Sequence, residues 1–282
     1  MASALFYKAA ELKEACALLS QYGKRAKILA GGIDVMAAVN RKLLSPEIVI
    51  SISSSGLDYI KAEGDSLVIG STTKHSEIVR SALVQEKTPL LVEVTKQIGS
   101  PAIRNMGTIG GNLVNASPAA DAAIALLALG ARLKLVSASG ERDVAVEGFF
   151  TGPGKTVLES DEILKEVRIP FQNADSKWAW YKIGKRKADI CSVISVAVAL
   201  EMDGNICRLA RIALGAVAPI PLLARQAGGL LEGKKPDEAL IEKVAKTASE
   251  ETTPIDDVRA TAWYRRKVSE TLVKRLLGQV LR

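Results

Sequence analysis

Short apolar runs and helical spacings alternate along the first 170 residues of the chain. Brief apolar stretches bounded by turn residues predict strands at residues 27–29, 47–52, 67–70, 132–137, 142–146 and 163–169. Apolar residues three and four positions apart predict helices at residues 11–21, 34–42, 73–81 and 88–98. This part of the chain is therefore expected to mix strands and helices.

The last third of the chain has a different order, in which strands come first and helices follow. Extended segments are predicted at residues 178–183, 192–202 and 206–214, with an Asp-Gly-Asn turn at 203–205. Helices are predicted at residues 236–249 and 259–277. This order, after a polar hinge that begins at Pro170, indicates a separate α+β domain.

Residues 108–121 combine a glycine pair with the expected start of a helix. Ser117 and Pro118 are typical of a helix N-cap and first turn, and Gly130 would end that helix. Gly110 and Gly111 carry no side chains, so a ligand can lie against their backbone N–H groups. Amides of this kind beside a helix N-terminus suit an anionic group such as a phosphate.

A second glycine pair, Gly31 and Gly32, follows an apolar run about 80 residues upstream. Two such pairs suggest two loops that close on one extended, phosphate-bearing ligand. The Gly-Pro-Gly-Lys-Thr run at 152–156 resembles a P-loop, but the glycine that should precede it is one residue out of place, so a turn is favoured. No Gly-x-Gly-x-x-Gly follows a strand, which disfavours a Rossmann site.

Charge is unevenly distributed along the 282 residues. The net charge is +7, and residues 171–282 hold 19 basic against 13 acidic residues. Their aromatic residues form two tight clusters instead of alternating with basic ones, so a solvated face or a partner-docking surface is favoured over a nucleic-acid site. No apolar run approaches the roughly 20 residues of a membrane span. No secretory signal is visible, and the cytoplasm is the expected location.

Metal and nucleophilic chemistry find little support in the sequence. The three cysteines, Cys16, Cys191 and Cys207, form no Cys-x-x-Cys pair, and His75 is the only histidine. An iron–sulfur cluster usually needs four thiolates, so none is expected here. A catalytic triad would have to use His75, whose surroundings predict a helix start instead.

Five motifs occur in an order that resembles a known protein family. They lie at residues 28–34, 70–78, 108–121, 149–156 and 181–189. The order is similar to that of the FAD-binding medium subunit of the molybdenum hydroxylases, which include xanthine dehydrogenase and aerobic carbon monoxide dehydrogenase. The resemblance covers essentially the whole chain.

The resemblance implies an α+β fold with two domains. Residues 1–170 would form an FAD-binding domain of the vanillyl-alcohol-oxidase type, whose subdomains, about 1–56 and 57–170, hold the cofactor between them. Residues 171–282 would form an α+β domain with a three-stranded antiparallel sheet and helices, and this domain would cover the flavin.

The resemblance also implies a set of cofactor contacts. The adenine and pyrophosphate side would be lined by Ile28, Leu29, Ala30, Gly31, Gly32, Ile33 and Asp34. The pyrophosphate and ribityl chain would be contacted by Thr108, Gly110, Gly111 and Asn112. Val114 would lie on the ring side, Asp121 at a polar flavin or ribityl atom, and Leu164 near the adenine or ring edge.

Lys182 would sit beside the isoalloxazine, where a cation stabilises the anionic reduced flavin. A solvated lysine in a basic run is the alternative for Lys182, and a favourable position in the helix dipole is the alternative for Asp121. Ile33 stands where the family often has threonine or another hydroxyl residue. One hydrogen bond to phosphate is therefore expected to be missing.

The implied function is electron transfer in a heteromeric oxidoreductase. Electrons would pass from a molybdenum cofactor in a large subunit, through [2Fe–2S] clusters in a small subunit, to FAD here and on to NAD⁺ or another acceptor. A dimer of heterotrimers is expected. Two other classes remain open. A stand-alone flavoprotein reductase needs a proton donor over the flavin that we cannot identify, and a nucleic-acid binder leaves both glycine pairs unexplained.

Overall fold

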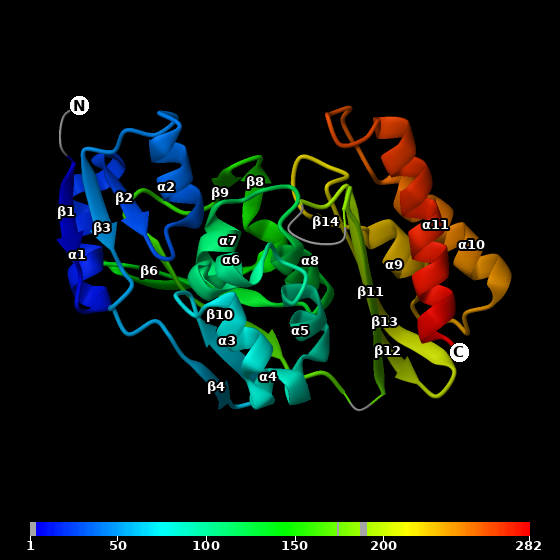
Figure 1. Ribbon diagram of the computed structural model, residues 1–282. Helices are drawn as coiled ribbons and strands as arrows, with labels where there is room; N and C mark the ends of the chain where they lie inside the picture. The colour runs from blue at the N-terminus through cyan, green and yellow to red at the C-terminus, as the bar shows by residue number, and fades with distance from the viewer. Residues whose placement is uncertain (1–3, 174, 187–190) are drawn as a thin grey trace.

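The computed structural model describes residues 4–173, 175–186 and 191–282. Within them the chain forms three units in a row, each built on its own sheet (Figure 1). The described chain begins in the first unit and ends just after the long helix of the last one. Residues 187–189 of the fifth motif lie outside the described residues.

The first unit is a small parallel sheet with two helices. Its strand order is β1-β3-β2, from β1 (Leu5–Lys8), β3 (Ile48–Ser51) and β2 (Ala26–Leu29). Helix α1 (Leu12–Tyr22) runs into a 3-10 turn (Gly23–Arg25), and α2 (Ile33–Asn40) follows the glycine pair. The strands and helices predicted here are confirmed to within two residues at each end. No residue of α2 is buried.

The middle unit is a five-stranded antiparallel sheet. Its order is β4-β5-β10-β6-β7, from β4 (Ile60–Glu63), β5 (Ser66–Gly70), β10 (Ile163–Pro170), β6 (Arg132–Ser137) and β7 (Gly140–Ala145). Val167 in the central strand pairs with Ile69 on one side and Leu133 on the other, and all three are fully buried. A hairpin of β8 (Phe150–Gly152) and β9 (Lys155–Thr156), after a 3-10 turn (Val146–Gly148), confirms the turn predicted at 152–156.

Six short helices complete the middle unit: α3 (His75–Arg80), α4 (Ala82–Lys87), α5 (Pro89–Thr95), α6 (Pro101–Met106), α7 (Ile109–Val114) and α8 (Asp121–Ala128). The sequence predicted three of them and missed α4, α6 and α7. Each missed helix has six residues, which is too short for a helical period to show. Each is held by an N-cap hydroxyl, from Ser81, Ser100 and Thr108 respectively.

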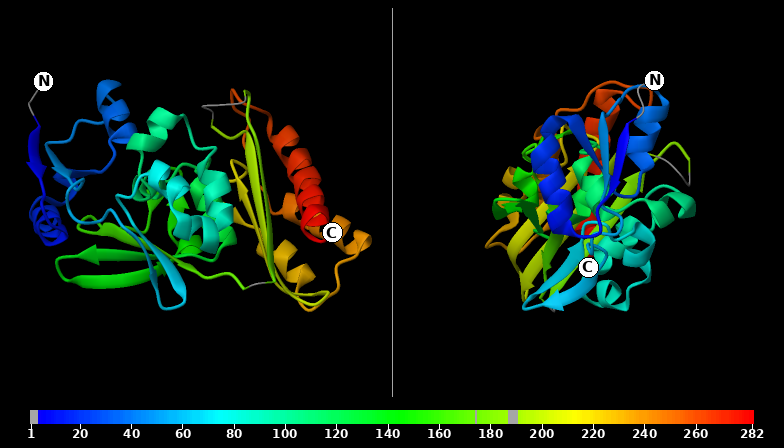
Figure 2. Two further views of the ribbon diagram at one scale, coloured as in Figure 1. Left: turned by 60° about the horizontal axis from the view of Figure 1, so that its bottom comes forward. Right: turned by 90° about the vertical axis from the view of Figure 1, so that its left-hand side faces the viewer.

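The helices of the middle unit lie between its own sheet and the sheet of the last unit (Figure 2). Among them, α8 contacts β12 and β13, and all of its residues are buried. It begins at Asp121, so the predicted start at Ser117 is wrong. The Ser117 hydroxyl accepts a hydrogen bond from the Ala119 amide instead, and the Pro118 carbonyl accepts one from the Ala216 amide. A contact with Ala216, the residue after the distant strand β13, therefore replaces the first helical turn. Gly130, with φ +66°, follows the helix as predicted.

The last unit is a four-stranded antiparallel sheet with three helices. Its order is β11-β12-β13-β14, from β11 (Ser176–Ile183), β12 (Ile194–Asp203), β13 (Ile206–Gly215) and β14 (Leu222–Leu223). The three predicted strands are confirmed, and β14 is a short fourth. The helices are α9 (Arg225–Leu231), α10 (Glu238–Glu250) and α11 (Ala262–Val280).

The sheet of the last unit packs on both faces. Val196 and Val198 of β12 belong to the cluster formed with α9, α10 and α11 on the outer face. Ala197, which lies between them, and Ala213 of β13 belong to the cluster of the middle unit. Because Ala197 and Ala213 are small, α8 can approach β12 and β13 closely.

Candidate functional site

The two glycine segments, residues 28–34 (the first segment) and 108–121 (the second segment), lie close together in the folded chain. A Cβ atom added to Gly31 would lie 2.0 Å from the carbonyl oxygen of Met106, just before the second segment. Only glycine therefore lets the first segment rest on this backbone. Gly32 has φ +79°, in the left-handed region where side chains are strained. The structure thus brings together two segments that the sequence singles out separately.

The second glycine pair is helical and not an open loop. Gly110 and Gly111 lie in the first turn of α7. The Gly110 amide donates to the Ser71 carbonyl at 2.9 Å, and the Gly111 amide donates to the Thr108 hydroxyl at 3.0 Å. The expectation that a ligand can lie against these amides is corrected, because protein acceptors already occupy them. A Cβ at Gly110 would lie 2.6 Å from the Ser71 carbonyl oxygen, so packing also requires glycine there.

Buried polar atoms without partners lie along the second segment. The hydroxyls of Ser71 and Thr72 and the Oδ1 atom of Asn112 make no hydrogen bond. Ser71 contacts Gly110, and Asn112 lies on the same helix. Buried polar atoms are nearly always paired, so these atoms indicate a polar partner that the chain itself does not supply. The oxygen-rich ribityl and pyrophosphate part of FAD fits this requirement.

A buried ion pair joins the middle unit to the last one. Lys182 Nζ, on β11, donates to Asp121 Oδ2 at 2.6 Å and to the Gln97 carbonyl at 3.0 Å. The Ser192 hydroxyl donates to Asp121 Oδ1 at 2.5 Å. The side chains of Lys182 and Asp121 are 5% and 6% exposed, so little water screens their charges. We call Asp121, Lys182 and Ser192 the interdomain cluster.

The structure brings Asp121 and Lys182 together, although 61 residues separate them in the sequence. The solvated alternative for Lys182 is wrong, because its side chain is buried. Ser192 was missed. Its hydroxyl reaches Asp121 only because β12 folds back beside β11, and no local pattern signals that contact.

The other predicted contacts differ in their exposure. Asp34 lies exposed in the first turn of α2, and Val114 exposes 37% of its surface. Leu164 is buried in the apolar core of the middle unit. Thr108 caps α7. The remaining residues are half-buried along the first segment, namely Ile28, Leu29, Ala30, Gly31, Gly32 and Ile33.

His75 is a buried residue beside the second segment. It begins α3, as predicted, and its amide donates to the Gly107 carbonyl at 3.0 Å. The residue is 2% exposed, and the Nδ1 atom of its ring has no hydrogen-bond partner. Burial, assisted by the charge of Arg104, lowers the pKa of His75 to about 4. The ring is therefore uncharged at neutral pH.

Acid is expected to destabilise the folded chain through His75. The ordinary pKa is 6.5 and the folded value about 4, so below pH 6.5 the unfolded chain binds the proton first. Stability from the neutral ring is complete above pH 6.5 and is lost as the pH falls through 4. The free energy of unfolding of wild type minus that of His75→Asn should fall by about 3 kcal/mol from pH 7 to 4. Urea denaturation measures both, and a constant difference would contradict the assignment.

The cysteines and acidic residues form no further centre among the described residues. No group of three His, Cys, Asp or Glu side chains there could hold a metal ion. Cys16 and Cys207 are buried free thiols, whereas Cys191 is an exposed one. Burial raises the pKa of Cys207 to about 11, so that thiol stays protonated. In the same part of the chain, no helix is long and apolar enough to cross a membrane.

The two parts of the chain match two protein-family models. Residues 2–172 match the FAD binding domain in molybdopterin dehydrogenase, and residues 179–280 match the CO dehydrogenase flavoprotein C-terminal domain. The chain therefore belongs to the family of FAD-binding medium subunits of molybdenum hydroxylases.

Individual relatives agree with this assignment. The carbon monoxide dehydrogenase medium chain of Hydrogenophaga pseudoflava is 35% identical over 266 residues, which cover 94% of this chain and 92% of that protein. The glyceraldehyde dehydrogenase medium chain of Sulfolobus acidocaldarius is 33% identical over 276 residues, which cover 98% of this chain and 97% of that protein.

A solved structure agrees as well. Carbon monoxide dehydrogenase from Hydrogenophaga pseudoflava, in a form that lacks the Mo-pyranopterin moiety of its cofactor, has a chain that matches with a TM-score of 0.95. The two chains are 33% identical, and the match covers 99% of this chain and 98% of that one. The predicted family, fold class, oxidoreductase class and FAD cofactor are confirmed.

Proposed function

We propose that this chain holds FAD between residues 1–56 and 57–170, and that residues 171–282 cover the flavin. The contact of the two glycine segments at Gly31 and the unpaired oxygen atoms near Asn112 support this site. Three hydrophobic clusters, each centred on one of the three sheets, support the division into two subdomains and a C-terminal domain.

The proposed contacts follow the order of the chain. The adenine and pyrophosphate lie along residues 28–34, and the pyrophosphate and ribityl chain lie along Thr108, Gly110, Gly111 and Asn112. Because the amides of Gly110 and Gly111 are already bonded, these two residues act mainly by leaving room beside α7. Val114 lies on the ring side, and Leu164 packs near the adenine or ring edge.

FAD, when bound, supplies one-electron and two-electron redox chemistry. The residues of this chain orient it and set the charge around it. The Lys182 ammonium, placed beside the isoalloxazine, favours the anionic reduced form. Asp121 holds that ammonium in place at 2.6 Å and offsets part of its charge. No acid–base pair in the chain is needed for this electron transfer.

We further propose the place of the chain in a complex. Electrons arrive from [2Fe–2S] clusters of a small subunit, after leaving the substrate at a molybdenum cofactor of a large subunit, and pass on to NAD⁺ or another acceptor. Relatives named as medium chains and FAD-binding subunits support a heteromeric enzyme. A dimer of heterotrimers and a cytoplasmic location stay predictions.

The unpaired buried oxygen atoms along α7 carry this proposal, and cofactor uptake tests it. Purified with its neighbouring subunits, the chain should be yellow and co-elute with iron and molybdenum. Apo chain should regain flavin absorbance on adding FAD. A colourless chain that takes up no FAD would contradict the proposal, and a yellow chain that co-elutes with no iron or molybdenum subunit would favour a stand-alone flavoprotein. Comparing NAD⁺ with a quinone analogue in the assembled complex identifies the acceptor.

A further inference from the structure

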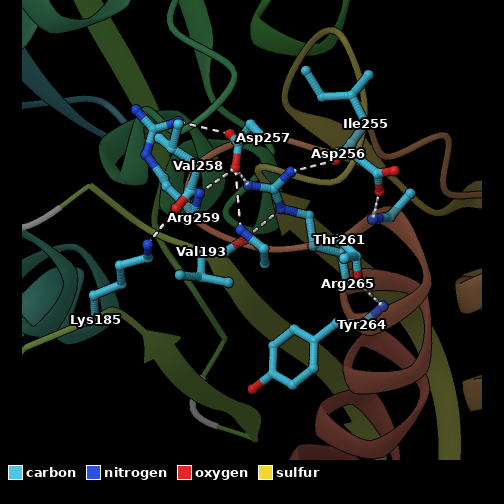
Figure 3. Close-up of polar contacts among 12 residues, drawn as sticks. Lys185, Val193, Ile255, Asp256, Asp257, Val258, Arg259, Thr261, Tyr264 and Arg265 are labelled. Carbon is cyan, nitrogen blue, oxygen red and sulfur yellow. Dashed lines mark hydrogen bonds and ion pairs between the residues drawn. The ribbon is translucent and has the colours of Figure 1, made fainter.

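A buried guanidinium group, Arg265, lies one turn into α11. The residue is 2% exposed, and its three nitrogen atoms donate to three different acceptors (Figure 3). Nε donates to the Val193 carbonyl at 3.0 Å, and Nη1 donates to the Ile255 carbonyl at 2.6 Å. Nη2 donates to Asp257 Oδ1 at 2.8 Å. We call Asp257 and Arg265 the clasp.

Asp257 organises the segment before α11. Besides Arg265, it accepts hydrogen bonds from the backbone amides of Arg259 and Ala260 and from the Arg259 guanidinium. Burial alone would raise the pKa of Asp257, but these donors outweigh it and lower the pKa well below its usual range. Because the amides of Arg259 and Ala260 are bonded to Asp257, α11 begins at Ala262 and not at the predicted residue 259.

The clasp reaches the interdomain cluster through one peptide unit. Val193 precedes β12, whose last pairing at this end is Ile194 with Ile183. The Val193 amide donates to the Ile183 carbonyl at 2.8 Å, and the Val193 carbonyl is held by Arg265. The residue before it is Ser192, whose hydroxyl donates to Asp121. Contacts therefore run without a gap from Asp257 to Arg265, to Val193 and Ser192, and then to Asp121 and Lys182.

An arginine at position 265 suits these three acceptors. Only a guanidinium presents donors in three fixed directions, so one side chain can hold two carbonyls and a carboxylate at once. A lysine has one nitrogen atom and cannot keep that spacing. Ser192 itself lies outside the strand ladder, so its backbone needs a fixed neighbour if its hydroxyl is to stay aimed at Asp121.

We propose that Arg265 is a positioning residue for the flavin site: the clasp fixes Ser192 and thereby sets the orientation of Asp121 and Lys182. The inference rests on the proposed function, since it assigns Lys182 to the flavin. Arg265 and Asp257 act from behind the sheet of the last unit and act on the cofactor only through Ser192.

The test compares Arg265→Lys with a matched control, Arg259→Gln, in the full chain. Arg259 donates to the same carboxylate, but among the described residues it makes no hydrogen bond with Val193. Arg265→Lys should weaken FAD binding about tenfold and lower the flavin midpoint potential, because a displaced ammonium stabilises reduced flavin less. Arg259→Gln should change neither quantity. Asp257→Asn is the second variant if Arg265→Lys does not fold, and should show the same pair of changes.

A double-mutant cycle distinguishes positioning from general loosening. If Arg265 acts through Ser192, then Arg265→Lys combined with Ser192→Ala should shift the potential no further than Ser192→Ala alone. Additive shifts, or a folded Arg265→Lys chain with wild-type FAD affinity and potential, would overturn the inference. Failure of the wild-type chain to bind FAD would instead contradict the proposed function itself.

Discussion

Replacing Gly31 with alanine is expected to push the two glycine segments apart and abolish FAD binding. The added methyl group would lie 2.0 Å from the Met106 carbonyl oxygen, and a backbone atom cannot move aside as a flexible side chain can. Overpacking of this kind costs about 3 kcal/mol of stability. Urea denaturation of the apo chain and titration with FAD measure the two effects.

The matched control is Gly229→Ala. Gly229 lies in α9, and an added Cβ there meets no atom within 4 Å. Alanine in a helix is favoured over glycine by roughly 0.5–1 kcal/mol, so this variant should be slightly more stable and bind FAD normally. If Gly31→Ala behaves like Gly229→Ala, the contact between the two segments has no role in the site.

Replacing Lys182 with methionine is expected to destabilise the chain by about 3–5 kcal/mol, because the change leaves the buried carboxylate of Asp121 without a counter-ion and with only the Ser192 hydroxyl bonded to it. The side chains of this pair are almost fully enclosed, so water cannot take over the role of the ammonium. If the Lys182→Met variant still binds FAD, the flavin midpoint potential should fall, since the lost ammonium favours the reduced form. Urea denaturation and a redox titration measure these changes.

Two controls separate the charge from the packing. Lys274→Met removes the lysine of an exposed pair with Glu242, where no measurable loss of stability is expected. Lys182→Met combined with Asp121→Asn removes both charges, and should recover part of the stability but not the potential. If Lys182→Met and Lys274→Met have equal effects, the interdomain cluster is not a buried ion pair in solution.

The elements predicted well are those whose side chains repeat over several turns or strand periods. Helices α1, α10 and α11 bury one face, so their period shows in the sequence, whereas β12 and β13 show as two long, largely apolar runs joined by a turn. The missed elements include helices α4, α6, α7 and α9 and strands β4 and β14, none of which exceeds seven residues, so none shows a clear period. Their existence depends on N-caps and on neighbouring segments.

Within the site, the residue types were predictable, but their partners were not. The glycine pairs, Asp121 and Lys182 stand out in the sequence because their motifs occur in a family-specific order. The hydrogen bond from the Gly110 amide to the Ser71 carbonyl cannot be predicted from the sequence, because α7 and the end of β5 meet only in the folded middle unit. The same holds for Ser192, which lies 71 residues after Asp121.

The sequence by itself determined the family, the α+β class and the cofactor, and it singled out the residues that we propose to hold that cofactor, since these follow from local pattern and motif order. Tertiary structure decided that α8 begins at Asp121, that the glycine amides are already bonded, and that Asp121 joins Lys182 to Ser192. These features arise where separate sheets and helices pack, and the free energy of such contacts depends on distant neighbours that no local window contains.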